Sequence, residues 1–217
     1  RAALSNDYIP ALRFAALTRF YDPVVRMTTR ERRVKQHLLT SADILPGTTV
    51  LDIGCGTGTM TVWLKQRYPS VNVIGLDADP AILAIAKAKA QRAGVDIRFL
   101  EANATTIPLP DNAVQSAVSS LFFHHLNTEQ KRAVLAEILR VLVPGGELHV
   151  SDWGRPSSAL MRGLFFIVQL LDGFTTTRDS VEGRLPQLIE ETGVRLFREI
   201  THFDTVLGTL RQFRATK

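Results

Sequence analysis

A short apolar segment that runs directly into three closely spaced glycines constrains the fold of this chain more than any other feature. Residues 48–53 have the composition of a buried β-strand, and Gly54, Gly56 and Gly58 follow at once. Glycines at such a turn permit backbone conformations that other residues avoid, and they let backbone N–H groups approach a ligand closely. Residues 57–67 then have the pattern of a helix. A strand, a glycine turn and a helix in this order predict an α/β fold with a ligand site at the turn.

Strand-like and helix-like segments continue to alternate after this turn. Asp79 and Pro80 mark the clearest helix start, because aspartate is a preferred N-cap and proline is favoured at the first helical position; Gly94 ends that helix. Asn127 or Thr128 is expected to cap a later helix that runs to residue 143, after which residues 144–146 turn the chain. We expect strands at residues 48–53, 71–76, 97–100, 113–119 and 147–151. Repeated strand–helix–strand units predict a parallel sheet with helices on both faces.

The alternation stops after residue 153. Residues 155–180 read as an apolar helix with a loop, and a last helix at residues 181–191 should stop at Gly193. Two strand-like runs, 194–200 and 203–214, are expected to pair as a hairpin at the sheet edge. The predicted fold is therefore a Rossmann-like, doubly wound, mostly parallel seven-stranded sheet. We expect one domain over residues 1–217: a helical N-terminal lid (1–45), a ligand-binding core (46–153), and a helical insert with C-terminal strands (154–217).

The glycine spacing and two acidic residues indicate which ligand the turn binds. A phosphate-binding loop of the G-x-x-x-x-G-K-[ST] type is absent, and Thr59 occupies the position of the third glycine in the dinucleotide fingerprint. Asp52 precedes the turn, where a negative charge would repel a pyrophosphate and would suit a ligand that carries an ammonium and a sulfonium. Asp77 ends the second strand, where a carboxylate can accept both hydroxyl groups of a ribose.

Three ordered segments resemble the class I S-adenosylmethionine-dependent methyltransferases. Besides the turn at residues 50–58, residues 101–111 look like the adenine-side segment of that family, and residues 140–148 look like its turn into the fifth strand. Together these matches span residues 48–153. Phe20-Tyr21-Asp22 further resembles the ubiquinone/menaquinone-methyltransferase-like subgroup (methyltransferase type 11).

The resemblance implies a cofactor-binding role for twelve residues. Asp52 would lie near the amino group of the cofactor, Asp77 would hold the ribose, and an amide oxygen of Asn103 would accept from the adenine amine, although many family members carry aspartate there. The cofactor-binding residues implied are Tyr21, Asp52, Gly54, Cys55, Gly56, Gly58, Asp77, Ala78, Asn103, Ala104, Leu121 and Phe122. Of these, Cys55 is expected to offer a backbone N–H and not a nucleophilic thiol. Four of these residues have a structural alternative. Asp52 could cap the turn, and Asp77 could be a turn former. Asn103 could be an ordinary loop residue, and Tyr21 could be a core residue.

His124 and His125 follow the fourth strand, where the reaction centre is expected. Either could act as a general base, because the unperturbed pKa of histidine lies near neutrality; the alternative is a structural histidine at the start of the next helix. Adjacent histidines are expected to point in different directions, so we expect no metal site. The apolar run at residues 164–171 is expected to line an apolar substrate pocket, to pack on the sheet or to form a dimer contact.

Charge and cysteine content limit the partners. The net charge is +5, and its excess lies near the N-terminus, which predicts either a solvated helix face or attraction to an anionic membrane surface or an acidic substrate. Nucleic acid is not expected, because no aromatic residues are interleaved with the basic ones. A single cysteine favours the reducing cytoplasm, although a removed targeting segment before Arg1 stays open. We expect a monomer or a homodimer.

The resemblance implies a methyltransferase that uses S-adenosylmethionine, forms S-adenosylhomocysteine, and needs no metal. The small acceptor is expected to be hydrophobic or amphipathic: a quinone precursor, a lipid or a secondary metabolite. Two alternatives stay open from the sequence. One is an S-adenosylmethionine-binding protein without catalytic activity that acts as an interaction subunit, and the other is a nicotinamide oxidoreductase, which the Gly54–Gly58 spacing disfavours.

Overall fold

The computed structural model describes residues 31–217, apart from the side chains of residues 171, 172 and 175. Helices and strands alternate through its first two thirds, as the sequence predicted. The elements in order are α2 (Glu31–Ser41), β1 (Thr49–Ile53), α3 (Thr59–Arg67), β2 (Asn72–Asp77), α4 (Pro80–Arg92), β3 (Arg98–Glu101), β4 (Val114–Ser120), the 3-10 helix η1 (Phe123–His125), α5 (Thr128–Val141), β5 (Leu142–Trp153), α6 (Ala159–Asp172), α7 (Phe174–Glu182), α8 (Leu185–Glu190), β6 (Leu196–Thr205) and β7 (Gly208–Thr216).

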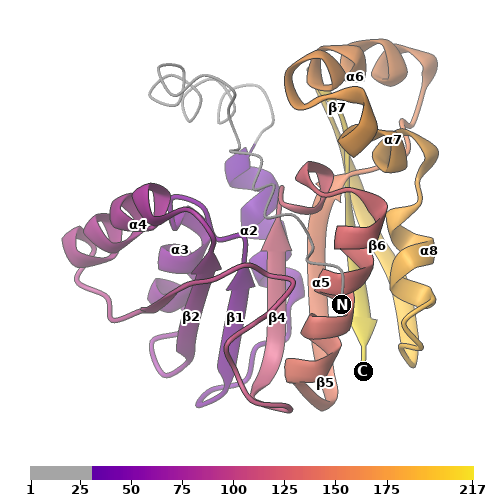
Figure 1. The fold of residues 1–217 in the computed structure, drawn as a ribbon. Helices are drawn as coiled ribbons and strands as arrows, with labels where there is room; N and C mark the ends of the chain where they lie inside the picture. Colours follow the sequence, from indigo (N-terminus) through magenta and orange to yellow (C-terminus); the bar gives the residue numbers. More distant parts are fainter. Residues whose placement is uncertain (1–30) are drawn as a thin grey trace, which may run out of the picture.

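The strands form one seven-stranded sheet in the order β3-β2-β1-β4-β5-β7-β6 (Figure 1). Strands β1 to β5 are parallel, and β7 runs antiparallel to both of its neighbours. The predicted mostly parallel, doubly wound sheet is thus confirmed. The strand order reverses between β1 and β4, and ligands of such sheets bind outside the carboxyl ends of the strands at this reversal.

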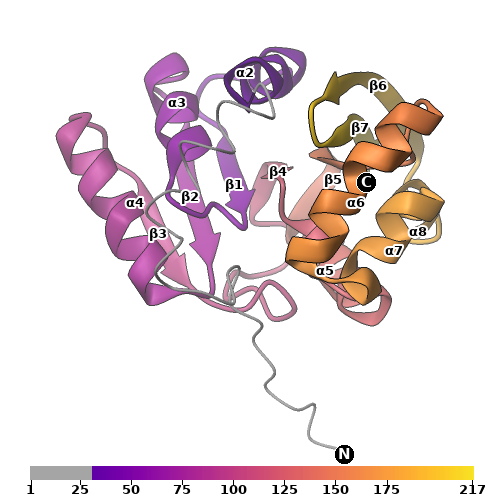
Figure 2. The ribbon, with the colours of Figure 1, turned by 90° about the horizontal axis from the view of Figure 1, so that it is seen from above.

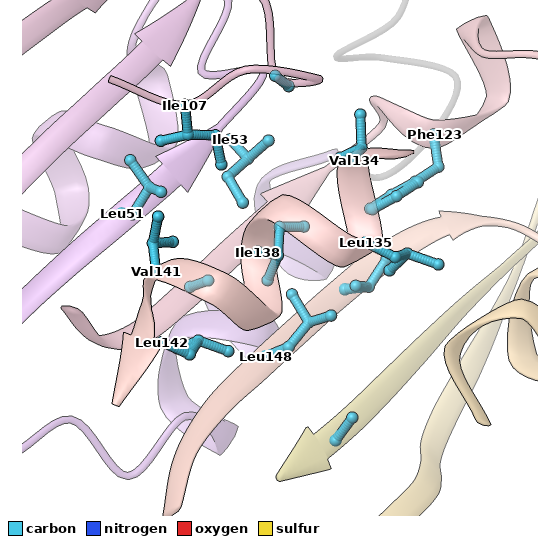
Figure 3. Packing of buried hydrophobic residues seen from close by; sticks show 14 of the residues in the cluster. Leu51, Ile53, Ile107, Phe123, Val134, Leu135, Ile138, Val141, Leu142 and Leu148 are labelled. Carbon is cyan, nitrogen blue, oxygen red and sulfur yellow. The ribbon is translucent and has the colours of Figure 1, made fainter. Parts of the chain in front are cut away.

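Helices cover both faces of the sheet (Figure 2). On one face, α2 and α3 pack on β1 and β2 through a cluster that includes Leu38, Leu64 and Val73. On the other face, α5 and α8 pack through a larger cluster, and Figure 3 shows Val134 and Ile138 of α5 lying over Ile53 of β1. Both faces of the central strands are therefore buried, which fits the mainly apolar sequences of β1 and β2.

Capping residues fix two of the helix starts. The Asp79 side chain accepts hydrogen bonds from the backbone N–H groups of Ala81 and Ile82, and Pro80 occupies the first turn of α4. Asn127 and Gln130 form a reciprocal capping box at the start of α5. The predicted helix starts are confirmed, and Asn127, not Thr128, is the cap of α5.

The sequence-based bounds are wrong in three places. Residues 144–146 do not form a turn before β5 but lie within it, at a bulge, since Leu142 pairs with Val114 and Glu147 with Ser116. The helix expected at 181–191 is broken by Gly183, which adopts a left-handed conformation and ends α7. The final hairpin turns after Thr205 and not near residue 201.

A buried ion pair joins the helical insert to the core. Lys131 of α5 is almost fully buried, and its Nζ lies 2.9 Å from Oδ2 of Asp179 on α7. Thr128 also donates to this carboxylate. The insert is thereby held at the start of α5, beside η1.

Among residues 31–217, no helix is long and apolar enough to cross a membrane. The helices expected before residue 31 lie outside the described residues, so α2 alone represents the predicted N-terminal helical region.

Candidate functional site

A cavity of about 210 Å³ opens at the carboxyl ends of β1, β2 and β4. This is the strand-order reversal at which a ligand site is expected. Its lining consists of Gly54, Gly56, Leu76, Asp77, Ala78, Ala102, Asn103, Ala104, Thr105, Leu121, Phe122, His125, Leu126 and Gln130. A larger open hollow of about 630 Å³ lies between α2 and α3, but none of its lining residues belongs to the glycine turn or to a strand. The smaller cavity is the one whose position and lining fit a site.

The three glycines of the turn have different structural reasons to be glycine. All three have positive φ, and at Gly54 a Cβ atom would come within 2.3 Å of the Phe122 ring. At Gly56 a Cβ would meet nothing, and Gly56 faces the cavity. At Gly58 a Cβ would come within 2.9 Å of Ala86 on α4. Gly58 does not line the cavity, and its small size allows α3 and α4 to pack closely.

Asp77 lies at the end of β2 and joins the glycine turn to the start of α4. Its Oδ2 accepts from the N–H of Gly56 at 2.9 Å, and its Oδ1 accepts from the N–H of Asp79 at 3.0 Å. Burial raises the pKa of Asp77, and these hydrogen bonds act in the opposite direction. The carboxylate lines the cavity, and each oxygen keeps a lone pair for a further donor.

Asp52 is buried under the turn and has an incomplete set of hydrogen bonds. Its Oδ2 accepts from the Thr61 hydroxyl at 2.6 Å, whereas its Oδ1 has no partner. Burial raises the pKa of Asp52 to about 6, against the lowering effects of Thr61 and of Lys35. A buried carboxylate oxygen without a donor fits a ligand that brings a positively charged amino group. The two acidic side chains of this site thus fit S-adenosylmethionine, which carries a positively charged amino group and a ribose with two hydroxyl groups.

The structure gives Cys55 a different role from the one expected. Its backbone N–H donates to the Leu76 carbonyl at 3.0 Å and is therefore not free for a ligand. Burial, followed by the charges of Asp52 and Asp77, raises the pKa of its thiol far above the usual value. The expectation of an available backbone N–H is wrong, and the thiol is not positioned as a nucleophile.

Asn103 forms a turn of its own at the cavity wall. Its Oδ1 accepts from both the backbone N–H and the hydroxyl of Thr105, at 3.0 Å each. The expected hydrogen bond from an adenine amine to this oxygen therefore has to compete with two internal donors. Asn103 lines the cavity together with Ala78 and Ala104.

Asp152, at the end of β5, holds the segment after β4 in place. Its Oδ2 accepts from the N–H groups of Phe122 and Phe123, at 3.0 and 2.6 Å. Its Oδ1 accepts from Nδ1 of His124 at 2.7 Å and from its neighbour's N–H. Leu121, just before this segment, has a φ of 58°, unusual for a residue with a side chain. This carboxylate was not singled out from sequence, and it keeps Leu121 and Phe122 over the cavity.

The two histidines lie in different environments. His124 is buried, bound to Asp152, and does not line the cavity, whereas His125 does. Their ring centroids are 3.9 Å apart, so the expectation that they point in different directions is wrong. Burial, followed by His124, lowers the pKa of His125 to about 3. His125 is therefore a neutral side chain at physiological pH.

Not every predicted site residue lines the cavity. Tyr21 lies outside the described residues. The cavity lining also does not include Asp52, Cys55, Gly58 or His124. Sequence reasoning did not single out Leu76, Ala102, Thr105, Leu126 and Gln130, which also line it. Within residues 31–217, no group of three or more potential metal-ligating side chains is present.

The fold and this site define a class of protein. A Rossmann-like sheet with a glycine turn after β1, acidic residues at the ends of β1 and β2, and no phosphate-binding loop is the arrangement of the class I S-adenosylmethionine-dependent enzymes. A family model described as a methyltransferase domain matches residues 50–146. A methyltransferase of uncharacterised function from Synechocystis is 30% identical over 187 residues, which cover 86% of this chain and 85% of that protein. The chain therefore belongs to the class I S-adenosylmethionine-dependent methyltransferases, of the ubiquinone/menaquinone-methyltransferase-like type.

Two further similarities agree with this assignment. The demethylmenaquinone methyltransferase of Thermus thermophilus is 34% identical over 146 residues, which cover 65% of this chain and 66% of that protein. A solved methyltransferase structure from Aquifex aeolicus has the same fold, with a TM-score of 0.64 at 22% identity, covering 84% of this chain and 88% of that one. The matches span 47–66% of the length of the first curated relatives.

Proposed function

We propose that this protein transfers a methyl group from S-adenosylmethionine to a small hydrophobic acceptor of the quinone type. The observation that carries the proposal is the cavity at the strand-order reversal, with the Asp77 carboxylate in its wall and the buried, unpartnered oxygen of Asp52 two residues before the cavity-lining Gly54. Family membership supports the reaction class. Its similarity to demethylmenaquinone and ubiquinone/menaquinone methyltransferases supports the acceptor class.

The residues divide into a cofactor side and an acceptor side. On the cofactor side, Gly54 and Gly56 would lie along the methionine part, Asp77 would accept from the ribose hydroxyls, and Asp52 would accept from the amino group. Ala78, Asn103 and Ala104 would surround the adenine. When bound, S-adenosylmethionine supplies an electrophilic methyl group on a positively charged sulfur.

On the acceptor side, the chain offers apolar surface and one neutral imidazole. Leu121, Phe122 and Leu126 line the cavity and would exclude water from the reacting groups. His125 would hold a hydroxyl or carbonyl group of the acceptor in line with the methyl group. Because its pKa is about 3, His125 is a weak base at neutral pH and would contribute orientation more than proton removal.

The first test is cofactor binding by calorimetry with S-adenosylhomocysteine. Asp77→Asn keeps the shape of the side chain but removes the charge and one acceptor oxygen. We expect its affinity to fall by about 1–3 kcal/mol, because hydrogen bonds to a charged group contribute on this scale. Asp96→Asn, at an exposed position in the loop before β3, is the matched control and should bind normally.

The second test is turnover. Wild-type protein with S-adenosylmethionine and a demethylated quinone should yield S-adenosylhomocysteine and an acceptor that is heavier by one methyl group. A polar acceptor of similar ring size, such as a catechol, should react more slowly. Binding of the cofactor without product from any acceptor would refute catalysis, and faster turnover of the catechol would refute the hydrophobic acceptor.

A further inference from the structure

Five large apolar side chains are exposed in a row on the helical insert. Leu160, Phe166, Ile167 and Leu170 of α6, and Phe174 at the start of α7, are 46–68% exposed. At about 100° per residue, the four on α6 fall within one arc of the helix surface. The ring of Phe174 continues the row, with its centroid 5.7 Å from that of Phe166. We call these five residues the apolar ridge.

The apolar ridge is not the face by which α6 is attached to the protein. Phe165 and Val168, on the opposite side of α6, are buried against Trp153 and Leu210 of the sheet. The Phe165 and Trp153 rings contact edge to face, with centroids 5.5 Å apart. Helix α6 is therefore anchored by one apolar face and exposes a second apolar face to solvent. An ordinary amphipathic surface helix would expose polar residues there.

The position of α6 relates the apolar ridge to the cavity. Helix α6 follows the carboxyl end of β5, which is parallel to β1 and β4, so it lies at the edge of the sheet where the cavity opens (Figure 1). Helix α7 in turn contacts η1, which contributes His125 to the cavity lining. The apolar ridge and the cavity thus share one end of the molecule.

The basic surplus of the chain lies in the sequence up to the first turn of α2, and α2 and α6 carry exposed arginines. Residues 1–35 contain eight basic and three acidic residues, a surplus of five that equals the net charge of the whole chain. Of this stretch, α2 is joined to α6, because Val34 of α2 is buried in the same cluster as Phe165. Arg32 and Arg33 are exposed on α2, and Arg162 is exposed on α6 itself.

We propose that the apolar ridge docks this protein on an anionic lipid surface. Large apolar side chains enter the boundary between headgroups and acyl chains, and flanking arginines are attracted to anionic headgroups. Two such signals together give stable peripheral binding where one would be marginal. The orientation would open the cavity toward the lipid in which a hydrophobic acceptor dissolves; this use of the docking surface rests on the proposed function.

Charge argues against two other occupants of the ridge. Residues 1–30 contain five arginines and two aspartates, so this segment would bring like charge to Arg32, Arg33 and Arg162. A symmetric pair of chains docked through the ridge would bring Arg162 of both copies into one interface, since a two-fold interface uses the same surface twice. An anionic membrane attracts both the basic stretch and the flanking arginines.

The experiment is co-sedimentation of the full chain with vesicles, without cofactor or acceptor. We expect binding to phosphatidylcholine vesicles that contain about 30% phosphatidylglycerol, and at least tenfold weaker binding to pure phosphatidylcholine. The double variant Ile167→Gln/Leu170→Gln should lose at least tenfold in partitioning. Arg32→Gln/Arg33→Gln should lose about fivefold per arginine and should depend less on salt.

Matched controls keep the test specific. Leu45→Gln removes a side chain that is 66% exposed, against 62% for Leu170, but before β1 at the opposite edge of the sheet. Arg92→Gln removes an exposed arginine at the end of α4. Both controls should partition as wild type does, and thermal unfolding should confirm that all variants are folded.

Three results would overturn the proposal. The wild type could fail to bind anionic vesicles. The ridge variant could partition as wild type does, as it would if another part of the chain covered the ridge. Sedimentation velocity could show that the ridge variant converts a dimer to a monomer, which would assign the ridge to a second copy. None of these results would touch methyl transfer, which is measured separately with soluble acceptor analogues.

Discussion

Replacing Asp52 by asparagine should make the protein more stable and its cofactor binding weaker. The buried carboxylate has one hydrogen bond from Thr61 and one oxygen without a partner. Its pKa is raised from 3.8 to about 6, chiefly by burial. At about 1.4 kcal/mol per pKa unit, the ionised carboxylate costs the folded state about 3 kcal/mol at neutral pH. Asparagine removes that cost, although burying its amide N–H groups without hydrogen-bond partners lowers the stability again by part of that amount.

The pH dependence distinguishes this explanation from a general packing effect. A carboxyl group whose pKa is higher in the folded state favours folding below its unfolded pKa of 3.8, and this contribution is lost as the pH rises through about 6. Asp52→Asn should therefore raise the free energy of unfolding by about 1–3 kcal/mol near pH 7.5, and the gain should shrink toward zero near pH 4. Urea denaturation followed by circular dichroism measures both values.

The effect of Asp52→Asn on cofactor binding can be measured as the stabilisation of the folded protein by ligand. S-adenosylhomocysteine at about a hundredfold its Kd should stabilise the wild type by about 2.7 kcal/mol, and the same concentration should stabilise Asp52→Asn far less. The exposed variant Asp96→Asn should change neither quantity. If Asp52→Asn were less stable than wild type near neutral pH, or differed from it equally at both pH values, the buried charge would not be the cause and the reasoning would be refuted.

Two further pairs of variants test the turn and the insert. Gly54→Ala should abolish measurable S-adenosylhomocysteine binding in calorimetry, because its Cβ would overlap the Phe122 ring, whereas Gly94→Ala, with nearly the same φ and open space, should bind normally. Lys131→Met should lower the free energy of unfolding in urea by about 3–5 kcal/mol, since it removes the nearest and most buried cation from the Asp179 carboxylate and leaves only the more distant Arg184. Arg132→Met, which removes an exposed ion pair one residue away, should cost less than about 1 kcal/mol. Equal effects within either pair would contradict the structural interpretation.

The sequence predicted the central sheet well because its signals are local. The strand before Gly54 is short and mostly apolar, and Asp79 with Pro80 marks a helix start that is independent of the rest of the fold. The turn between β6 and β7 had no such signal. It is closed by the Thr205 hydroxyl, which accepts from the N–H of Leu207 and donates to the Gly208 carbonyl. Threonine and leucine in that position read as strand.

The site was predicted in outline but not in its hydrogen bonds. Sequence placed Asp77 and Gly56 at the turn, yet it could not show that one accepts from the other. It also predicted a free backbone N–H at Cys55, whereas this N–H donates to the Leu76 carbonyl of β2. Asp152 escaped notice because a single aspartate at a strand end has no distinctive spacing, and its role arises only when β5 meets the segment after β4.

The unmet hydrogen-bonding demands of this fold are concentrated where the ligand is expected. Among the described residues, the buried side-chain atoms without a hydrogen-bond partner are Oδ1 of Asp52 and Oγ of Ser120, at the carboxyl ends of the adjacent strands β1 and β4. Leu121, with its positive φ, follows Ser120 directly. Each of these features costs stability in the protein alone. Nearly all other buried polar groups in this region are paired. A ligand that donates hydrogen bonds to these two oxygens would therefore remove a cost that the free protein carries, and this gain would contribute to its binding free energy.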